Sequence, residues 1–397
     1  MTTPIDKEQK KLNVPPLRFP EFEGEWEKCR VSDLLDFYST NSLSWDKLEF
    51  DVYNILNLHY GLIHVGLPTM VDLDKDRLPN IIADNIPNNY ELCKEGDIAF
   101  ADASEDTNEV AKAVEFYSIH EKKVICGLHT IHGRDNKGKT VVGFKGYAFS
   151  SKAFNNQIRR IAQGTKIYSI SVKNFSECYI GIPSKEEQTK IGNLLRLIDD
   201  RIATQNKIID KLHSLIKGIR NEVFGKLRKS VGFNTVIGNV LNYEQPQPYI
   251  VENTEYTNEG TPVLTANKAF VLGYTTETNG IYRKGDCIIF DDFTLDCKYV
   301  DFPFKVKSSA IKILTAENKE LLRYTYEFLT YLDLKTDEHK RHYIAETQNQ
   351  SLILPNTQII GIVAHIFSAL SLRMEYVVRQ KDNFEKQKQY LLCQMFI

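Results

Sequence analysis

The chain has 397 residues, of which 42% are hydrophobic and 11% aromatic, so it can bury the cores of two domains. No uninterrupted apolar run reaches the roughly 18 residues of a membrane-spanning helix, and residues 1–13 lack the apolar segment of a signal peptide. These features predict a globular, cytoplasmic protein without a membrane partner. The net charge of −2 excludes a uniformly basic nucleic-acid binder, although the charges are unevenly distributed along the chain.

The first globular segment mixes strand and helix patterns. Residues 49–66 and 123–132 alternate apolar and polar side chains, as half-buried strands do. Residues 153–163, AFNNQIRRIAQ, predict a helix with basic residues on its surface, and residues 165–183 return to extended structure. The segment therefore has an α+β character.

The charge changes sign within this segment. Between residues 51 and 115 there are thirteen Asp and Glu against four Lys and Arg, whereas residues 134–173 contain nine Lys and Arg against one Asp. Such polarised charge can create a nucleic-acid footprint on one face of a nearly neutral molecule. An ordinary solvated surface explains the same counts about equally well.

One motif favours a nucleotide-binding interpretation. Residues 133–140, GRDNKGKT, match the phosphate-binding pattern G-x-x-x-x-G-K-T, and residues 287–292, CIIFDD, resemble the acidic strand that accompanies it. A phosphate loop needs a helix directly after it, because the helix N-terminus supplies the donors. Residues 141–149, VVGFKGYAF, instead predict a strand, so we expect a turn between two strands with Lys137 and Lys139 at its tip.

Other catalytic or metal-binding patterns are weak. The seven cysteines contain no C-x-x-C pair, and His129 and His132 are not framed by a metalloprotease motif. We therefore predict core cysteines, structural histidines, no metal site and no catalytic site.

Residues 184–225 predict a long helix with an apolar seam, and residues 353–397 repeat it at an offset of 172. Apolar residues advance in alternating steps of four and three, which places them along one side of a helix of roughly 34 residues. Pro183 and Pro355, and Phe224 and Phe396, are equivalent in the two copies. The predicted seam consists of Ile191, Leu195, Ile198, Ile202, Ile209, Leu212, Ile216, Val363, Phe367, Leu370, Met374 and Val377.

A second globular segment, residues 226–352, lies between the two helices in the sequence. It contains strand patterns at 261–274, 285–293 and 300–314, followed by an amphipathic helix at 319–332. With the first segment, residues 1–183, this arrangement predicts an α+β protein: two globular domains related by pseudo-two-fold symmetry and separated by two long antiparallel, coiled-coil-like helices.

At this point the sequence resembles the specificity subunits of type I restriction-modification systems. The resemblance begins at residues 14–35, VPPLRFPEFEGEWEKCRVSDLL, and is sharpest at residues 180–202, IGIPSKEEQTKIGNLLRLIDDRI. It implies that residues 24–178 and 236–344 are target-recognition domains, each reading one half of a bipartite DNA site. Residues 357–367 depart from the family pattern, and Lys381 and Lys388 interrupt the second seam.

The resemblance also implies the partners. Double-stranded DNA, two methyltransferase subunits and ATP-dependent restriction subunits would bind this chain, whereas S-adenosylmethionine, ATP and Mg²⁺ would be held by those partner subunits. The helices would set the spacing between half-sites and dock the methyltransferase subunits. Two alternatives stay open: a P-loop ATPase that uses GRDNKGKT, and a coiled-coil scaffold that does not bind DNA.

Candidate DNA contacts come from basic residues and from side chains suited to base edges. In the first domain they are Arg134, Lys137, Lys139, Lys145, Asn155, Asn156, Gln157, Arg159, Arg160 and Lys166. In the second domain they are Lys268, Arg283, Thr294, Lys298, Lys305, Lys307, Lys340 and Arg341.

Overall fold

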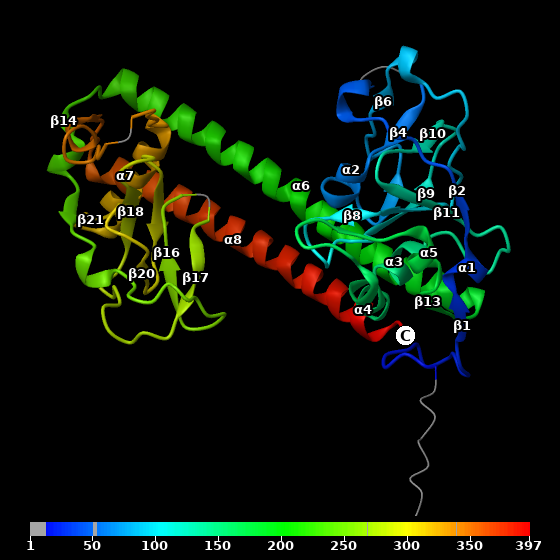
Figure 1. Ribbon diagram of the computed structural model, residues 1–397. Coiled ribbons are helices and arrows are strands. Elements are labelled where there is room, and N and C mark those ends of the chain that lie inside the picture. The colour runs from blue at the N-terminus through cyan, green and yellow to red at the C-terminus, as the bar shows by residue number, and fades with distance from the viewer. Residues whose placement is uncertain (1–12, 51–53, 268, 339) are drawn as a thin grey trace, which may run out of the picture. The chain divides into compact units, whose positions relative to one another are not determined.

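The computed structural model describes residues 13–50, 54–267, 269–338 and 340–397. The chain forms two compact units (Figure 1). Unit 1 comprises Met1–Gln205 and Gln380–Ile397, and unit 2 comprises Asn206–Arg379. Each long helix therefore contributes one part to each unit. The mixture of sheets with two long helices confirms the predicted α+β class.

Unit 1 is built on a five-stranded sheet with the order β2-β11-β7-β9-β5. Only the β5–β9 pair is parallel. The strands are β2 (Asp36–Tyr38), β5 (Met70–Asp72), β7 (Ile98–Ala101), β9 (Ala113–Ser118) and β11 (Thr130–Arg134). All four residues of β7 are buried, so this central strand is covered on both faces.

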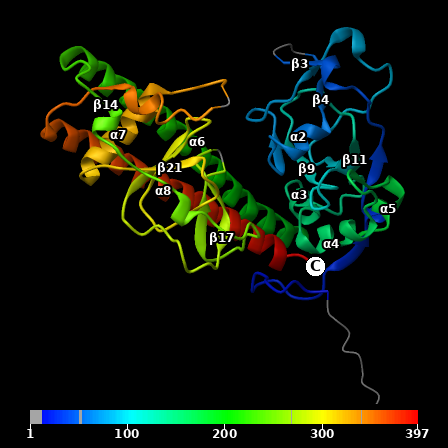
Figure 2. The same cartoon turned by 60° about the vertical axis from the view of Figure 1, so that its left-hand side comes forward.

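A smaller sheet covers one face of the five-stranded sheet, and short helices cover the other (Figures 1 and 2). Ala99 and Ala101 of β7 pack toward the smaller sheet, whereas Ile98 and Phe100 pack against the helices, as the alternation of side chains in a strand requires. The smaller sheet has the order β10-β4-β6-β3. Its strands are β3 (Leu48–Glu49), β4 (Leu56–Leu58), β6 (Asn80–Ile81) and β10 (Val124–Cys126).

Short elements complete unit 1. The two-stranded pairs are β1 (Glu27–Arg30) with β13 (Tyr179–Ile182) and β8 (Ala103–Ser104) with β12 (Tyr168–Ser169). The helices are α1 (Val31–Leu34), α2 (Tyr60–His64), α3 (Lys145–Phe149), α4 (Lys152–Ile161), α5 (Val172–Ser176), η1 (Trp45–Lys47) and η2 (Ala83–Asn85). Two strand predictions are wrong in part, because α2 lies within 49–66 and α3 within 141–149. Each forms one short helix instead: α2 buries Ile63, and all five residues of α3 are buried.

Unit 2 repeats this layered plan with fewer strands. Its main sheet has the order β15-β21-β18-β19, and a second sheet has the order β17-β16-β20. The strands are β14 (Thr235–Val236), β15 (Asn242–Glu244), β16 (Thr261–Leu264), β17 (Val271–Thr275), β18 (Cys287–Asp291), β19 (Cys297–Val300), β20 (Lys305–Val306), β21 (Ile311–Thr315) and β22 (Ser351–Leu352). The helices are α7 (Lys319–Leu332), η3 (Ile237–Asn239), η4 (Gln247–Tyr249) and η5 (Thr347–Asn349).

The two units share one strand order. In both, the first strand pairs with the last long strand of the main sheet, which pairs with a fully buried central strand, β7 or β18. Ile288 and Phe290 of β18 face the helices, and Cys287 and Ile289 face the second sheet, as their counterparts do in β7. The internal repeat therefore extends beyond the long helices to the globular domains.

The long helices are α6 (Lys185–Ser230) and α8 (Thr357–Gln394). Their first residues are 172 apart, which matches the offset found in the sequence. The expected length of roughly 34 residues is wrong, because α6 has 46 residues and α8 has 38. The helix predicted at 184–225 continues to residue 230, since its last turns still bury Leu227 in unit 2. All twelve predicted seam residues are buried or half-buried.

Within each unit the helices run antiparallel. In unit 1, Asp199 forms an ion pair with Lys388 at 2.7 Å, and the Arg201 guanidinium lies 5.7 Å from the Phe384 ring centroid. In unit 2, Arg220 lies over the Phe367 ring. As residue numbers increase along α6, the numbers of the contacting residues in α8 therefore decrease.

Helix α8 differs from expectation in its hydropathy. Its length and composition would suffice to cross a membrane, although only 22% of its most apolar window is buried. Within unit 2, α8 contributes Val363 and Phe367 to the hydrophobic core. Other apolar residues of α8 are exposed, among them Ile362, Ile366, Leu372 and Tyr376.

Candidate nucleic-acid interface

Equivalent turns follow the central strands of the two main sheets. Asp102 follows β7, and its backbone N–H donates to the carbonyl of His129 at 3.1 Å. Asp292 follows β18, and its backbone N–H donates to the carbonyl of Ala310 at 2.9 Å. A concave surface adjoins each turn. We call these surfaces the first cleft and the second cleft.

The first cleft has a volume of about 410 Å³ and is lined by Tyr60, His64, Ala103, Ser104, Glu105, His129 and Ile167. A row of aromatic rings extends from this cleft to the surface. Between ring centroids, Trp45 lies 4.4 Å from His59, and His59 lies 4.7 Å from Tyr60. The Tyr60 ring lies 5.2 Å from that of His129. Such rings can pack against bases, sugars or thymine methyl groups, while the imidazoles can bond base edges.

His59 positions this aromatic row. Its Nδ1 accepts a hydrogen bond from the backbone N–H of Gly61 at 3.1 Å and so caps the short helix α2. Burial lowers the pKa of His59, which keeps the ring neutral and Nδ1 available as an acceptor. His129 has a left-handed backbone, with φ of 54°, which is uncommon for a residue with a side chain and is characteristic of constrained sites.

The second cleft has a volume of about 280 Å³ and is lined by Tyr243, Gln245, Gln247, Asp292, Lys312, Arg341, Ile344 and Ala345. Buried Asp292 holds it together, because its carboxylate accepts from the backbone N–H groups of His342 and Tyr343 and pairs with Lys312 at 3.1 Å. Exposed Arg341 lies on the loop that this carboxylate anchors. Arg and Gln are side chains that read guanine and adenine edges.

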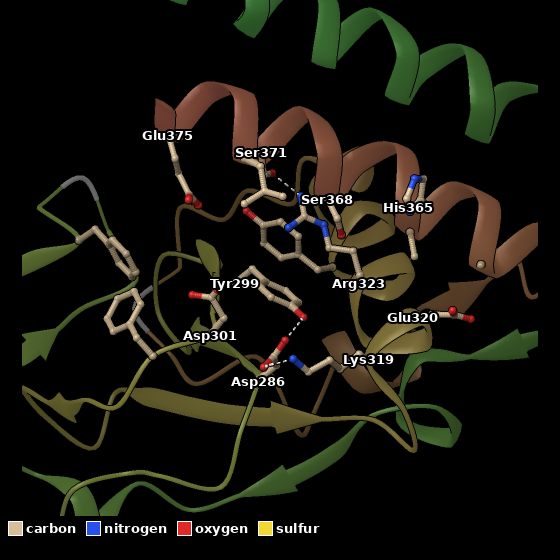
Figure 3. Close-up of a pocket in the computed structure, with 16 residues that line it drawn as sticks. Asp286, Tyr299, Asp301, Lys319, Glu320, Arg323, His365, Ser368, Ser371 and Glu375 are labelled. Atoms are coloured by element: carbon tan, nitrogen blue, oxygen red, sulfur yellow. Dashed lines mark hydrogen bonds and ion pairs between the residues drawn. The ribbon is translucent and has the colours of Figure 1, made fainter. Parts of the chain in front are cut away.

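A third concavity, the helix-side pocket, lies between α7, β19 and α8 in unit 2 (Figure 3). Arg323 crosses it, donating to the Phe367 carbonyl at 3.1 Å and to Ser371 Oγ at 2.5 Å, and pairing with Glu327 at 2.8 Å. Glu327 also pairs with Arg220 of α6 at 2.7 Å. Hydrogen bonds and ion pairs of Arg323 and Glu327 therefore link α7 to both long helices. Carboxylates line the pocket, which suits a DNA phosphate poorly; they are Asp286, Asp301, Glu320 and Glu375.

The structure buries several predicted DNA contacts inside the domains. Arg134 forms two 2.8 Å hydrogen bonds with Asp97, which raise its pKa, and Lys145 pairs with buried Glu115 at 3.2 Å. Lys305 pairs with Glu277 at 2.7 Å. These three cations balance internal carboxylates, so we no longer assign them to a DNA surface.

Other candidates, half-buried or exposed, already have partners within the chain. Gln157 bonds both backbone groups of Tyr179, and half-buried Lys139 pairs with Glu27 at 2.6 Å. Exposed Lys137 donates to the carbonyl of Asp33. Lys340 pairs with Glu338 and Glu346.

The remaining candidates are scattered. Asn155 and Arg159 line a groove of about 470 Å³ in unit 1 beside Lys152 and Lys388. Among the described residues, Arg341 is the one predicted contact that lines either cleft. Lys268 lies outside the described residues. Asn156, Arg160, Lys166, Arg283, Thr294 and Lys307 are exposed elsewhere, and Lys298 is half-buried in β19.

The phosphate-loop pattern at 133–140 has a different use. The Asp135 carboxylate accepts hydrogen bonds from the backbone N–H groups of Lys137 and Thr140 and from the Thr140 hydroxyl. The Asp135 carboxylate therefore occupies the N–H donors that the phosphate of a nucleotide would need. Helix α3 begins only at Lys145. The structure gives no support to the P-loop ATPase alternative.

Residues that the sequence did not nominate line most of both clefts. Tyr60 and His64 come from α2 and His129 from the connection between β10 and β11, so the fold brings two distant segments together, and His129 had been predicted to be structural. Gln245 and Gln247 flank Pro246 after β15. The signal available in the sequence was these two glutamines on either side of a proline. Such a pattern indicates an exposed polar turn rather than a strand.

Comparisons with known proteins point to one family. A family model described as the type I restriction modification DNA specificity domain matches residues 78–214. The specificity subunit of the Escherichia coli type I restriction enzyme EcoR124I/EcoR124II is 46% identical over 126 residues, which are 30% of this chain and 31% of that protein. The alignment thus spans less than a third of that relative.

Solved structures share the fold across nearly the whole chain. The type I restriction-modification S subunit from M. genitalium aligns with a TM-score of 0.64 and 17% identity, covering 97% of this chain and 99% of that one. A chain from a structural study of complex assembly and conformational transition of the type I R-M system aligns with a TM-score of 0.53 and 12% identity, covering 95% and 98%.

Proposed function

We propose that this chain is a specificity subunit of a type I restriction-modification system and that it reads the DNA sequence for such a complex. Each recognition domain reads one half of a bipartite site. The observation that carries this proposal is the pair of clefts beside Asp102 and Asp292, at equivalent turns of two sheets with the same strand order. Repeated sites on a repeated fold suit a DNA sequence with two half-sites.

We assign base recognition to the clefts and positioning to exposed cations outside them. The first cleft offers imidazole and aromatic groups, and the second offers Gln245, Gln247 and Arg341. Arg159 and Lys166 are suited to phosphates, which fix the orientation without reading sequence. The different side chains in the two clefts imply different half-site sequences.

The chemistry of the complex would belong to its partners. We propose two methyltransferase subunits that hold S-adenosylmethionine, and restriction subunits that use ATP and Mg²⁺, with no catalytic site on this chain. All of these act on cytoplasmic DNA. The long helices would set the distance between the half-sites, since a helix of fixed length separates two readers by a fixed amount.

The exposed apolar face of α8 is suited to a methyltransferase subunit. Ile362, Ile366, Leu372 and Tyr376 are between 38% and 67% exposed, and at 100° per residue they fall within about 120° of helix surface. Apolar and aromatic residues gathered in this way mark protein interfaces. Leu372→Lys should abolish co-purification with the methyltransferase subunit, whereas Asp382→Lys, an exposed substitution elsewhere on the helix, should not.

A domain exchange tests the two-reader function. Residues 236–344 are replaced by the equivalent domain of a related subunit, and methylated adenines are mapped genome-wide. One half of the methylated sequence should change while the other half stays the same. If both halves change together, or if no bipartite motif depends on this chain, the proposal is wrong and a scaffold without DNA contacts becomes the better explanation.

Point variants test the assignment to clefts. Arg341→Ala should relax the second half-site, costing about 1–3 kcal/mol of discrimination for a lost base contact, and His64→Ala should relax the first half-site. Lys226→Ala removes one exposed charge on α6 and serves as the control. Equal weakening of all sequences by Arg341→Ala would identify a phosphate contact instead.

A further inference from the structure

Three buried side chains meet between the two sheets of unit 1. Cys93 precedes β7, Cys126 ends β10 of the smaller sheet, and His132 lies in β11 of the main sheet. They are 6%, 1% and 0% exposed. The two Sγ atoms are 3.6 Å apart, and a ligand atom from each of the three residues lies within 4.8 Å of the others. Their spacing in the sequence had predicted no metal site, because the fold alone brings them together.

The histidine is already oriented in the manner of a metal ligand. His132 Nε2 lies 2.8 Å from Asp97 Oδ2, and Asp97 is fixed by Arg134 and by the backbone N–H of Lys94 at 2.8 Å. Histidines that bind metals usually donate their other ring N–H to a carboxylate held in this way. His132 Nδ1 is buried and has no hydrogen-bond partner among the described residues. An unsatisfied buried ring nitrogen needs an explanation.

We propose that Cys93, Cys126 and His132 Nδ1 bind one zinc ion. Two thiolates and an imidazole are ligands that zinc accepts, and a Zn–S distance of about 2.3 Å in tetrahedral geometry separates two sulfurs by about 3.8 Å. The observed separation is 3.6 Å, so the thiols need to move little. Zn²⁺ with two thiolates is neutral, which suits a buried site, and beside it Arg134 pairs with both Asp97 and half-buried Glu91.

A disulfide accounts for less of the geometry. It would require the two sulfurs to approach to about 2.05 Å, whereas they are 3.6 Å apart. It would also leave His132 Nδ1 without a partner. The zinc ion satisfies all three groups at once.

Zinc at this position would join three segments of the first recognition domain. It would fix β10 of the smaller sheet to β11 of the main sheet, and the connection between these strands carries His129 of the first cleft. We therefore infer that the metal holds the first cleft in its reading geometry. This last step rests on the proposed function, but the binding of zinc does not.

The experiment uses the full chain purified from zinc-supplemented medium without chelator. Elemental analysis should find one zinc per chain, and X-ray absorption should find two sulfur ligands and at least one nitrogen ligand. Co²⁺ in place of zinc should give a thiolate-to-cobalt charge-transfer band. Cys93→Ser and Cys126→Ser should lose the metal, whereas Cys178→Ser, which alters another buried thiol of unit 1, should keep it.

Three results would overturn the zinc site: a folded wild-type chain without metal, metal retained in full by Cys93→Ser, or a mass and thiol titration showing a Cys93–Cys126 disulfide. The X-ray absorption measurement needs no variant, so misfolding of a substituted chain does not prevent a decision. Methylation mapping is independent of these measurements. A chain that binds no zinc but still directs methylation to a bipartite site would refute the metal site and leave the proposed function intact.

Discussion

Phe224 and Phe396 lie 172 residues apart in the sequence, Phe224 within α6, six residues before its last residue, and Phe396 two residues beyond the end of α8. Phe224 is fully buried in unit 2, with its ring 5.5 Å from Tyr324 and 5.4 Å from Phe328. Phe396 is buried in unit 1, with its ring 6.3 Å from Trp26 and 6.0 Å from Phe144. An aromatic residue near the C-terminal end of each long helix therefore belongs to the core of a different unit.

Because the two phenylalanines are buried in different units, we expect substitution of each to destabilise a different unit. Phe224→Ala should destabilise unit 2 and Phe396→Ala should destabilise unit 1, each by about 3–5 kcal/mol, since a buried ring is lost and a cavity remains. Hydrogen exchange followed by mass spectrometry reads the two units separately. Tyr390→Ala, at a position that is 59% exposed, is the control. Faster exchange in the sheet of unit 1 after Phe224→Ala would contradict the assignment of that residue to unit 2.

Two glycines of α6 should respond in opposite directions to alanine. A Cβ atom at Gly192 would lie 2.5 Å from the carbonyl oxygen of Gly143, so Gly192→Ala should force the helix away from this loop and lower stability. At Gly218 the described residues leave open space within 4 Å, so Gly218→Ala should raise stability by about 0.5–1 kcal/mol through helix propensity. Urea unfolding measures both. Equal effects would show that α6 does not press on residue 143.

The loop that carries Arg341 should depend on pH. The hydrogen bond with Glu346 raises the pKa of His342 above 6.5, and Lys340 and His342 lower the pKa of Glu346 below 4.5. Because the pKa of His342 is higher in the folded loop, its ion pair with Glu346 stabilises the loop fully below the pKa of the unfolded chain. This stabilisation is lost as pH rises through the pKa of the folded state. The lowered glutamate pKa means that its contribution is lost as pH falls through the folded value. The loop should be most ordered between about pH 5 and pH 6.5.

Proteolysis within residues 340–347, measured from pH 5 to pH 8.5 and corrected for the protease's own pH profile, tests this dependence. His342→Gln should remove the loss of protection on the alkaline side. DNA discrimination at the second half-site should follow the same curve, since Arg341 is on this loop. A wild-type profile that stays flat through the alkaline range would refute the role of the His342–Glu346 pair.

The loop at 133–140 should not bind nucleotide. We expect no ATP binding by calorimetry either in the wild type or in Lys139→Ala, because Asp135 occupies the loop's N–H donors. Loss of the partly exposed Lys139–Glu27 ion pair should cost at most about 1 kcal/mol. ATP binding by the wild-type chain that disappears in the variant would restore the ATPase alternative.

The sequence by itself determined the elements whose patterns are local. The amphipathic helix predicted at 319–332 has these same bounds in α7, and the helix predicted at 153–163 is observed at 152–161. The two long helices start 172 residues apart, as predicted. Helical periodicity depends on residues that are three and four positions apart in the sequence, so it can be recognised without knowledge of distant contacts.

Only the tertiary structure decided which polar residues form sites. Lys145 and Arg341 are both cations in turn-rich segments, yet one is buried against Glu115 and the other lines the second cleft. Cys93, Cys126 and His132 become neighbours through the register of three separate strands and loops. Charge and spacing along the chain carry no information about such partners, because sheet pairing brings together residues that are tens of positions apart and desolvates some of them while leaving others exposed.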